Sequence, residues 1–189
     1  GSLSVNHCDF RGNICRVGGA IFCGSHGQLS IRNCDFHDNN CQQGVVWIDS
    51  SNLRVEVSRL HHNQILEGGA IVVFVADNVT LDSCQIDSNR NTGAYVPTVT
   101  IWGAESTTVR ACSFLDNAVR TNPVTGGAAL TIGPGASLIE QCTFARNEGA
   151  GSAALSFGTG GNIGGYIRDC TFENNRTYAS SGVVNCIRY

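Results

Sequence analysis

The sequence predicts an all-β protein, a right-handed parallel β-helix (β-solenoid) of about seven coils. Its 189 residues include 23 Gly but only 3 Pro, and charged residues make up 14% of them, which favours strands and turns over long helices. A short segment recurs in seven units, spaced 24 to 30 residues apart. Such a period is typical of a solenoid, because one unit cannot bury its own apolar face.

The units align on a column that is Cys in all of them except the third, where Ser58 replaces it. An apolar residue lies three positions before this column, and Phe, Leu or Ile lies two positions after it, as inward strand positions require. The column itself consists of Cys8, Cys34, Ser58, Cys84, Cys112, Cys142 and Cys170. The preceding apolar column runs from Val5 to Ile167, and the following one runs from Phe10 to Phe172.

Every unit has an asparagine three residues after the Phe, Leu or Ile position. Asparagine favours turns, and neighbouring strands lie about 4.8 Å apart, so we expect each side-chain amide to bond the amide one coil away. The structural ladder consists of Asn13, Asn39, Asn63, Asn89, Asn117, Asn147 and Asn175.

A second strand follows a small residue in each unit. Its two inward columns run from Ile21 to Val184 and from Cys23 to Cys186. We expect two or three strands per coil, with loops after the asparagine and after the second strand. The right hand follows from the general preference of parallel crossovers. Residues 1–189 are expected to form a single β-helix domain. Because both ends are still in phase with the repeat, we expect a segment of a longer extracellular protein or end-to-end self-association.

An outward column of alternating charge supports the parallel register. It consists of Asn6, Arg32, Glu56, Asp82, Arg110, Glu140 and Arg168. Opposite charges on neighbouring strands stabilise the pairing. The alignment therefore requires Arg110 to lie between Asp82 and Glu140.

The repeats resemble those of the polymorphic membrane proteins, the chlamydial-type autotransporter adhesins. Phe-x-x-Asn begins at Phe10, Phe36, Phe114, Phe144 and Phe172, and Gly-Gly-Ala begins at Gly18, Gly68 and Gly126. The resemblance covers all seven units. It implies a surface-exposed passenger segment with an adhesive role.

The ten cysteines follow the repeat and show no zinc-ligand spacing. The Cys column is either an inward stack of thiols or a set of disulfides between adjacent coils, since stacked Cα atoms lie within disulfide range. Cys15 and Cys41 each lie in a predicted loop five residues beyond a Phe. We expect a disulfide between them, and therefore an oxidising compartment. Cys23 and Cys186 share a column but lie in the first and last units.

Two polar clusters are weighed as sites. His37, His61 and Asp87 share one column, and Asp38 and His62 share the next, so these side chains are weak candidates for metal ligands. The alternative is a solvated turn surface, and we expect no cofactor. In addition, Asp9 and Asp35 are expected to stack in adjacent coils, and their carboxyl groups are the candidate for a catalytic acid pair.

Exposed aromatic residues indicate a binding surface. Phe22, Trp47 and Val72 occupy the outward column of the second strand, and Phe74 and Trp102 lie just past it. They form a partner surface unless a loop folds over them. Two sequons provide candidate glycosylation sites at Asn78, in a predicted loop, and more weakly at Asn175.

The net charge of −3 without a basic block argues against nucleic acid, and no apolar run is long enough to insert into a membrane. We expect a non-catalytic extracellular or cell-surface module, a rigid rod for adhesion or for building a filament. Its partner is a protein or glycan ligand, or another copy stacked end to end. The alternative is a carbohydrate-active β-helix enzyme, a polysaccharide lyase or hydrolase.

Overall fold

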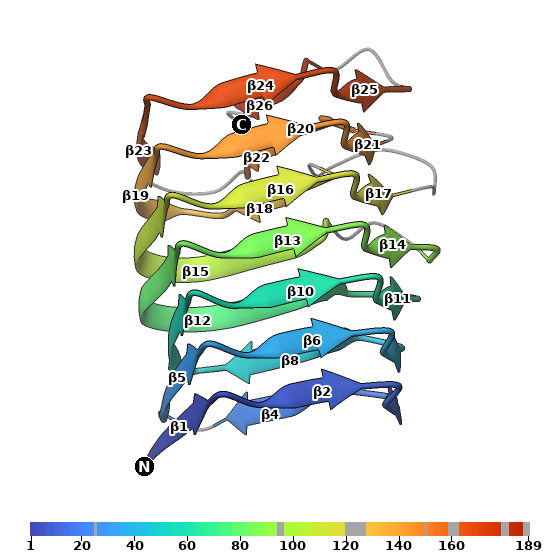
Figure 1. Ribbon diagram of the computed structural model, residues 1–189. Helices are drawn as coiled ribbons and strands as arrows, with labels where there is room; N and C mark the ends of the chain where they lie inside the picture. Colours follow the sequence, from blue (N-terminus) through green and yellow to red (C-terminus); the bar gives the residue numbers. More distant parts are fainter. Residues whose placement is uncertain are drawn as a thin grey trace.

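The structure is a computed structural model that describes residues 1–24, 26–93, 97–119, 128–149, 151–158, 163–178 and 182–186. The side chains of Ile163, Asn185 and Cys186 lie outside this description, as do Gly126 and Gly127 of the third Gly-Gly-Ala motif. The described part of the chain is a stack of parallel strands (Figure 1). It contains no helix long and apolar enough to cross a bilayer.

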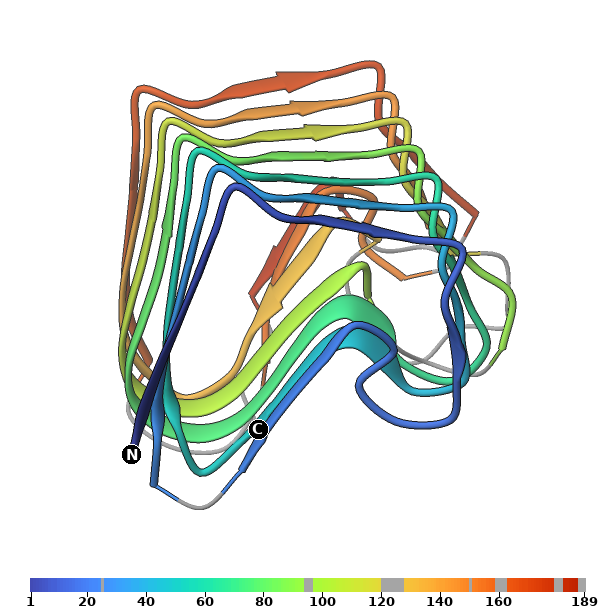
Figure 2. The same cartoon turned by 60° about the horizontal axis from the view of Figure 1, so that its bottom comes forward.

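Each coil has four sides, which are visible when the stack is tilted towards its axis (Figure 2). The first side consists of β1 (Ser2–Asn6), β5 (Gln28–Arg32), β9 (Asn52–Glu56), the second half of β12 (Gly69–Asp82), the second half of β15 (Val99–Arg110), β19 (Gly135–Glu140) and β23 (Ile163–Arg168). The second side consists of β2 (Asp9–Arg11), β6 (Asp35–His37), β10 (Arg59–His61), β13 (Gln85–Asp87), β16 (Ser113–Leu115), β20 (Thr143–Ala145) and β24 (Thr171–Glu173).

The remaining two sides return the chain to the next coil. The third consists of β3 (Ile14–Cys15), β7 (Asn40–Cys41), β11 (Gln64–Ile65), β14 (Arg90–Asn91), β17 (Ala118–Val119), β21 (Glu148–Gly149) and β25 (Arg176–Thr177). The fourth consists of β4 (Ile21–Gly24), β8 (Gly44–Asp49), the first halves of β12 and β15, β18 (Leu130–Ile132), β22 (Leu155–Phe157) and β26 (Val184–Cys186). The expected two or three strands per coil are therefore exceeded where the fourth and first sides have separate strands, but not where β12 or β15 runs through both sides.

The predicted register is confirmed. Val5 pairs with Ile31, Phe10 with Phe36, and Ile21 with Val46, and the same columns continue to the last coil. These columns form the core, with side chains that are almost fully buried in the central coils. Phenylalanines in one column stack face to face, as in Phe114 on Phe144, with ring centroids 4.7 Å apart.

The asparagine ladder is also confirmed. The Nδ2 of Asn63 donates to the Oδ1 of Asn89 at 2.9 Å and to the carbonyl oxygen of Phe36 at 2.9 Å. The backbone N–H of Asn63 donates to the same Oδ1 at 3.1 Å. This pattern repeats from Asn13 to Asn175. Each buried amide thus replaces strand hydrogen bonds that the turn would otherwise lose.

Arg110 lies between Asp82 and Glu140, as the charge column requires. It pairs directly with Asp82, and Arg168 pairs with Glu140, with Nε 2.7 Å from Oε2. Asp82 and Glu56 are like-charged neighbours in this column. Arg54 lies next to them, and its guanidinium contacts Glu56 at 2.7 Å, which reduces the repulsion between the two carboxylates.

The corners between sides use left-handed backbone that the sequence did not predict. Residues with positive φ recur at the same corner in successive coils, and few of them are glycine. They include two valines, Val57 with a φ of 48° and Val75 with a φ of 54°. Because the same conformation recurs up the stack, the geometry of the coil imposes it, and it does not by itself mark a functional site.

Candidate binding surface

An aromatic stripe runs up the outer face of the fourth side over four coils. Phe22 is opposite Trp47, the Trp47 ring lies 5.2 Å from the Phe74 ring, and Phe74 is opposite Trp102. Phe22, Phe74 and Trp102 are 58%, 38% and 40% exposed, and Trp47 is partly buried. Phe22, Trp47, Phe74 and Trp102 therefore form an apolar stripe in contact with solvent.

Val72 is not part of this surface, although it shares the outward column with Trp47. Its side chain is only 1% exposed, so the expectation that it is exposed was wrong. Thr100, Thr131 and Ser156, in the same column of later coils, are also buried. The candidate surface therefore does not include this column in these coils, whereas the aromatic rings remain exposed.

The indole of Trp102 extends the stripe towards the later coils. A Cβ atom on Gly133 would lie 3.1 Å from the indole, and one on Gly158 would lie 2.7 Å from it. The ring therefore lies over two glycines that leave room for it. The stripe consequently reaches beyond the four coils that supply its side chains.

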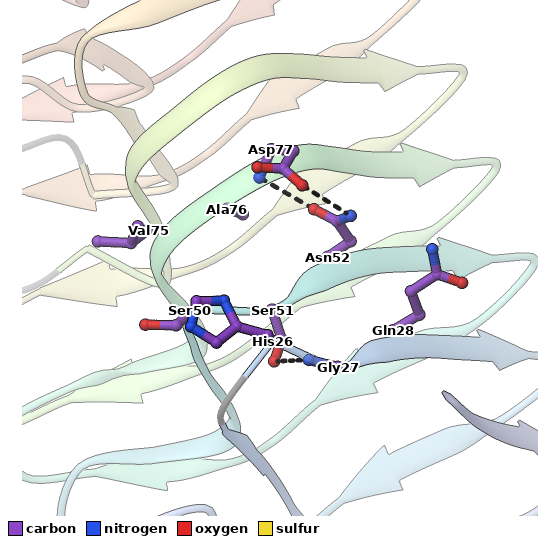
Figure 3. A pocket seen from close by; sticks show the side chains of 9 residues that line it. All are labelled: His26, Gly27, Gln28, Ser50, Ser51, Asn52, Val75, Ala76 and Asp77. Atoms are coloured by element: carbon purple, nitrogen blue, oxygen red, sulfur yellow. Dashed lines mark hydrogen bonds between the residues drawn. The ribbon is translucent and has the colours of Figure 1, made fainter. Parts of the chain in front are cut away.

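A polar depression borders the stripe at the corner between the fourth and first sides (Figure 3). We call it the bend groove, and His26, Gln28, Ser50, Asn52 and Asp77 line its polar part. Its volume is about 300 Å³, and a second hollow of about 470 Å³ continues it along the first side, sharing Gln28 and Asn52. Since Val75 lines the groove and directly follows Phe74, the aromatic and polar surfaces are adjacent.

Side chains take over hydrogen bonds where the strands bend. The Oδ1 of Asn52 accepts hydrogen bonds from the backbone N–H groups of Asp77 at 2.9 Å and Asn78 at 2.8 Å. The Oγ of Ser51 accepts one from Gly27 at 2.9 Å. Figure 3 shows both contacts at the groove wall. Asn52 and Ser51 therefore hold the shape of the bend.

Two groove side chains have no such structural role. Within the described residues, the side chains of His26 and Gln28 have no hydrogen-bond partner, and both line the hollow. The sequence reasoning missed the groove because no single residue type recurs in it. A signal was present in the amides of successive first-side strands, because Gln28 is opposite Asn52 and the Oδ1 of Asn52 accepts from the N–H of Asn78.

The predicted histidine cluster does come together on the second side. His37 and His61 are opposite one another, and their rings stack with centroids 5.1 Å apart. His37 lies between two carboxylates, with Nε2 3.2 Å from Asp9 and Nδ1 2.7 Å from Asp38. The hydrogen bond with Asp38 is the main reason why the pKa of His37 is raised.

His61 is in a different environment. Its Nδ1 is 2.7 Å from the Nδ1 of His62, so one of these nitrogens must donate and the other accept. Its Nε2 is 3.0 Å from Asp35 but is not aligned for a hydrogen bond. Burial, followed by the positive charge of Arg59, lowers the pKa of His61.

The cluster does not form the metal site that was weighed. Asp87 is opposite His61, but its carboxylate accepts two hydrogen bonds from Arg59, at 3.0 and 3.2 Å. In the part of the chain that the structure describes, no group of three or more His, Cys, Asp or Glu side chains is arranged to hold a metal ion. The metal candidates His37, His61, His62 and Asp87 are therefore better described as a network of ion pairs and stacked rings.

The acid pair is present as stacked neighbours, because Asp9 is opposite Asp35. Each carboxylate lies beside a histidine of the following coil, His37 for Asp9 and His61 for Asp35. The acid pair is therefore part of the same network as the stacked histidines.

The two sequons differ in accessibility. Asn78 is exposed, but it lies within β12, and its predicted location in a loop was wrong. The Nδ2 of Asn175 donates to the carbonyl oxygen of Phe144 at 2.7 Å. A glycan on Asn175 would remove this ladder contact, whereas Asn78 remains a candidate.

The nine cysteines whose side chains the structure describes are thiols. Cys15 and Cys41 are directly opposite one another, but in the short strands β3 and β7, and not in loops as expected. Cys41 is buried, which raises the pKa of its thiol to about 11. The predicted disulfide between them stays a prediction.

Comparison with protein families found one match. The model described as "Right handed beta helix region" matches residues 1–99 and 70–186, and the overlap of the two ranges fits a chain of similar repeats. The match agrees with the predicted right hand, but it does not extend to the polymorphic membrane proteins in particular. Comparison with curated proteins and with solved structures gave no match.

Proposed function

Because the chain belongs to the right-handed β-helix family, we propose that it is a rigid, non-catalytic surface module that binds a glycan. The aromatic stripe is the observation that carries this proposal. Four aromatic side chains form one row in contact with solvent on a scaffold whose other large apolar columns are buried in the central coils. A row of this kind on a soluble protein is typical of a binding surface.

The chemistry of the two adjoining surfaces favours a glycan over a protein. Sugar rings offer CH-rich faces that stack on aromatic rings and hydroxyl edges that need hydrogen-bond partners. The stripe supplies the rings, and the bend groove supplies the amide of Gln28 and the imidazole of His26, which have no hydrogen-bond partner within the described residues. Binding sites commonly combine a largely apolar surface with a few polar groups that fix orientation.

The scaffold suits an extracellular role. In-register stacking of side chains on every side holds the coils in one arrangement, so a ligand meets a surface that loses little conformational freedom on binding. The exposed sequon at Asn78 and the paired cysteines are both compatible with secretion. Adhesion at a cell surface is the role that combines rigidity with glycan binding.

A glycan array with the purified chain tests the proposal. We expect binding to a subset of glycans, weakened at least about tenfold by Trp47→Ala or Trp102→Ala, since buried aromatic anchors dominate such interfaces. Tyr166→Ala is a matched control, because Tyr166 is an exposed aromatic residue on another side of the coil. Thermal melts must show that all three variants stay folded. Absence of any glycan binding, or equal loss in the control, would contradict the proposal.

A carbohydrate-active enzyme is the second candidate, and the stacking of Asp9 on Asp35 is the observation that favours it. Incubation with a panel of polysaccharides tests it, with reducing ends or unsaturated products as the readout. Product formation that is abolished by Asp9→Asn or Asp35→Asn would establish this candidate. Turnover that survives both substitutions would place the site elsewhere.

A further inference from the structure

The cysteines lie opposite one another in neighbouring coils. Cys15 pairs with Cys41 in β3 and β7. On the Cys column, the N–H of the residue after Cys34 donates to the carbonyl oxygen of Cys8 at 2.9 Å. The residues after Cys112, Cys142 and Cys170 make the same contact at 2.9 Å. The N–H of Ser113 donates to the carbonyl oxygen of Cys84, that of Thr143 to Cys112, and that of Thr171 to Cys142. Each of these cysteines therefore has another cysteine one strand spacing away.

That spacing suits a disulfide. Neighbouring strands lie about 4.8 Å apart, and the Cα atoms of disulfide-bonded cysteines lie about 4.4 to 6.8 Å apart. The bridges can therefore close by side-chain rotation while the coils keep their positions.

The sulfur atoms lean towards the preceding coil. The Sγ of Cys112 is 3.4 Å from the backbone nitrogen of Cys84, and the Sγ of Cys170 is 3.5 Å from that of Cys142. The sulfur of each of these two cysteines is therefore close to the cysteine of the preceding coil.

Ser58 divides the column into groups with even numbers of cysteines. It separates Cys8 and Cys34 from the run of four that begins at Cys84. Its hydroxyl accepts a hydrogen bond from the N–H of Cys34 at 3.1 Å and donates to the carbonyl oxygen of Glu56 at 2.7 Å. These are the contacts that a sulfur atom makes elsewhere in the column. The hydrogen bonding of the column therefore does not require sulfur.

We propose that these thiols are oxidised to four disulfides between adjacent coils, Cys8–Cys34, Cys15–Cys41, Cys84–Cys112 and Cys142–Cys170. The neighbour of Cys84 in the preceding coil is Ser58, so Cys84 can pair only with Cys112. That bond leaves Cys142 to pair with Cys170. Cys23 stays a thiol, because Ile48 is opposite to it.

A small-molecule disulfide, such as oxidised glutathione, is the oxidant. A cysteine thiolate attacks one of its sulfurs and releases one glutathione as thiol, leaving a mixed disulfide on the protein. The neighbouring cysteine then attacks the protein-bound sulfur, forms the bridge and releases the second glutathione. In total, two protein thiols and one glutathione disulfide become one protein disulfide and two glutathione thiols.

The bridges link particular coils and imply an oxidising compartment. The first and second coils are joined twice, the fourth and fifth once, and the sixth and seventh once. The third coil, which carries Ser58, is held to both neighbours by noncovalent contacts alone. Reduction is therefore expected to weaken the contacts between the first and second, fourth and fifth, and sixth and seventh coils, and to leave those of the third coil unchanged.

Oxidative refolding of the full chain with reduced and oxidised glutathione tests the proposal. We expect an intact mass about 8 Da below that of the fully reduced chain, which is two hydrogen atoms for each of four bridges. Peptide mapping without reductant must then recover the four linkages. The mass of the reduced chain, or a linkage between Cys112 and Cys142, would overturn it.

Cys112→Ser separates this pairing from its alternative. Serine reproduces the hydrogen bonds of the column, as Ser58 does, so the variant should fold. We expect it to lose one bridge, with Cys84 becoming alkylatable after denaturation while Cys142–Cys170 remains. Cys23→Ser is the control and should keep all four bridges. Loss of the Cys142–Cys170 linkage in Cys112→Ser would refute the assigned pairs.

Discussion

Two corners of the same coil satisfy the hydrogen bonds of their backbone in different ways. At the corner between the second and third sides, every coil uses asparagine, and each buried amide bonds the next one. At the corner between the fourth and first sides, each coil differs, with His26, Ser50 and Val75 at the left-handed position. There, different side chains restore the backbone hydrogen bonds, Asn52 at Asp77 and Asn78 and Ser51 at Gly27. A repeated column thus indicates a structural role, and a column that varies leaves room for a binding site.

The largest effect is expected from breaking the repeated corner. Asn89→Ala removes the donor to the carbonyl oxygen of Leu60 and the acceptor that serves the N–H of Asn63, and it leaves both groups buried. Unsatisfied buried groups cost about 1–3 kcal/mol each, so we expect a loss of about 3–5 kcal/mol in the free energy of unfolding. Urea denaturation measures it.

Asn52→Ala is the matched substitution at the variable corner. Its amide also serves two backbone N–H groups, but these are exposed, so water replaces the lost bonds. We expect a loss of only about 1 kcal/mol. Equal losses in the two variants would mean that the distinction between the corners is not energetic.

His37 and His61 lie in one column that, unlike the asparagine column, holds other residues in the neighbouring coils. Hydrogen bonding to Asp38, with Asp9 and Asp35 nearby, raises the pKa of His37, whereas burial and Arg59 lower the pKa of His61 despite Asp35 and Asp87. An NMR titration should therefore place the pKa of His37 above 6.5 and that of His61 below it. Asp38→Asn should lower the first pKa more than the second.

The signs of the two contributions to stability are opposite. His37 stabilises the fold below pH 6.5, and this contribution is lost as the pH rises through its raised pKa. The contribution of neutral His61 is present above pH 6.5 and is lost as the pH falls through its lowered pKa. Acidification should therefore destabilise the His61→Gln variant less than the unmodified chain. It should destabilise His37→Gln more, and the reverse order would contradict the assignment.

The repeated columns are also what the sequence could predict. Cys8 to Cys170, Phe10 to Phe172 and Asn13 to Asn175 recur at fixed offsets, so the register follows from stacking like residues. The bend groove could not be found in this way, because His26, Ser50 and Asp77 come together only through the corner geometry. Val72 was misplaced for a related reason, since periodicity gives the side of a strand but not what covers it.

The smallest effect tests the left-handed position of the bend itself. Val75 is exposed and has a φ of 54°, where its branched Cβ is strained. Asparagine tolerates this backbone, so Val75→Asn should raise the free energy of unfolding by about 0.5–1 kcal/mol. Val17→Asn is the control, because Val17 is also exposed but does not have a positive φ. If both variants have the same stability, the left-handed backbone is not strained at this corner. If only Val75→Asn gains, the branched side chain of Val75 adds strain to the left-handed backbone at this corner.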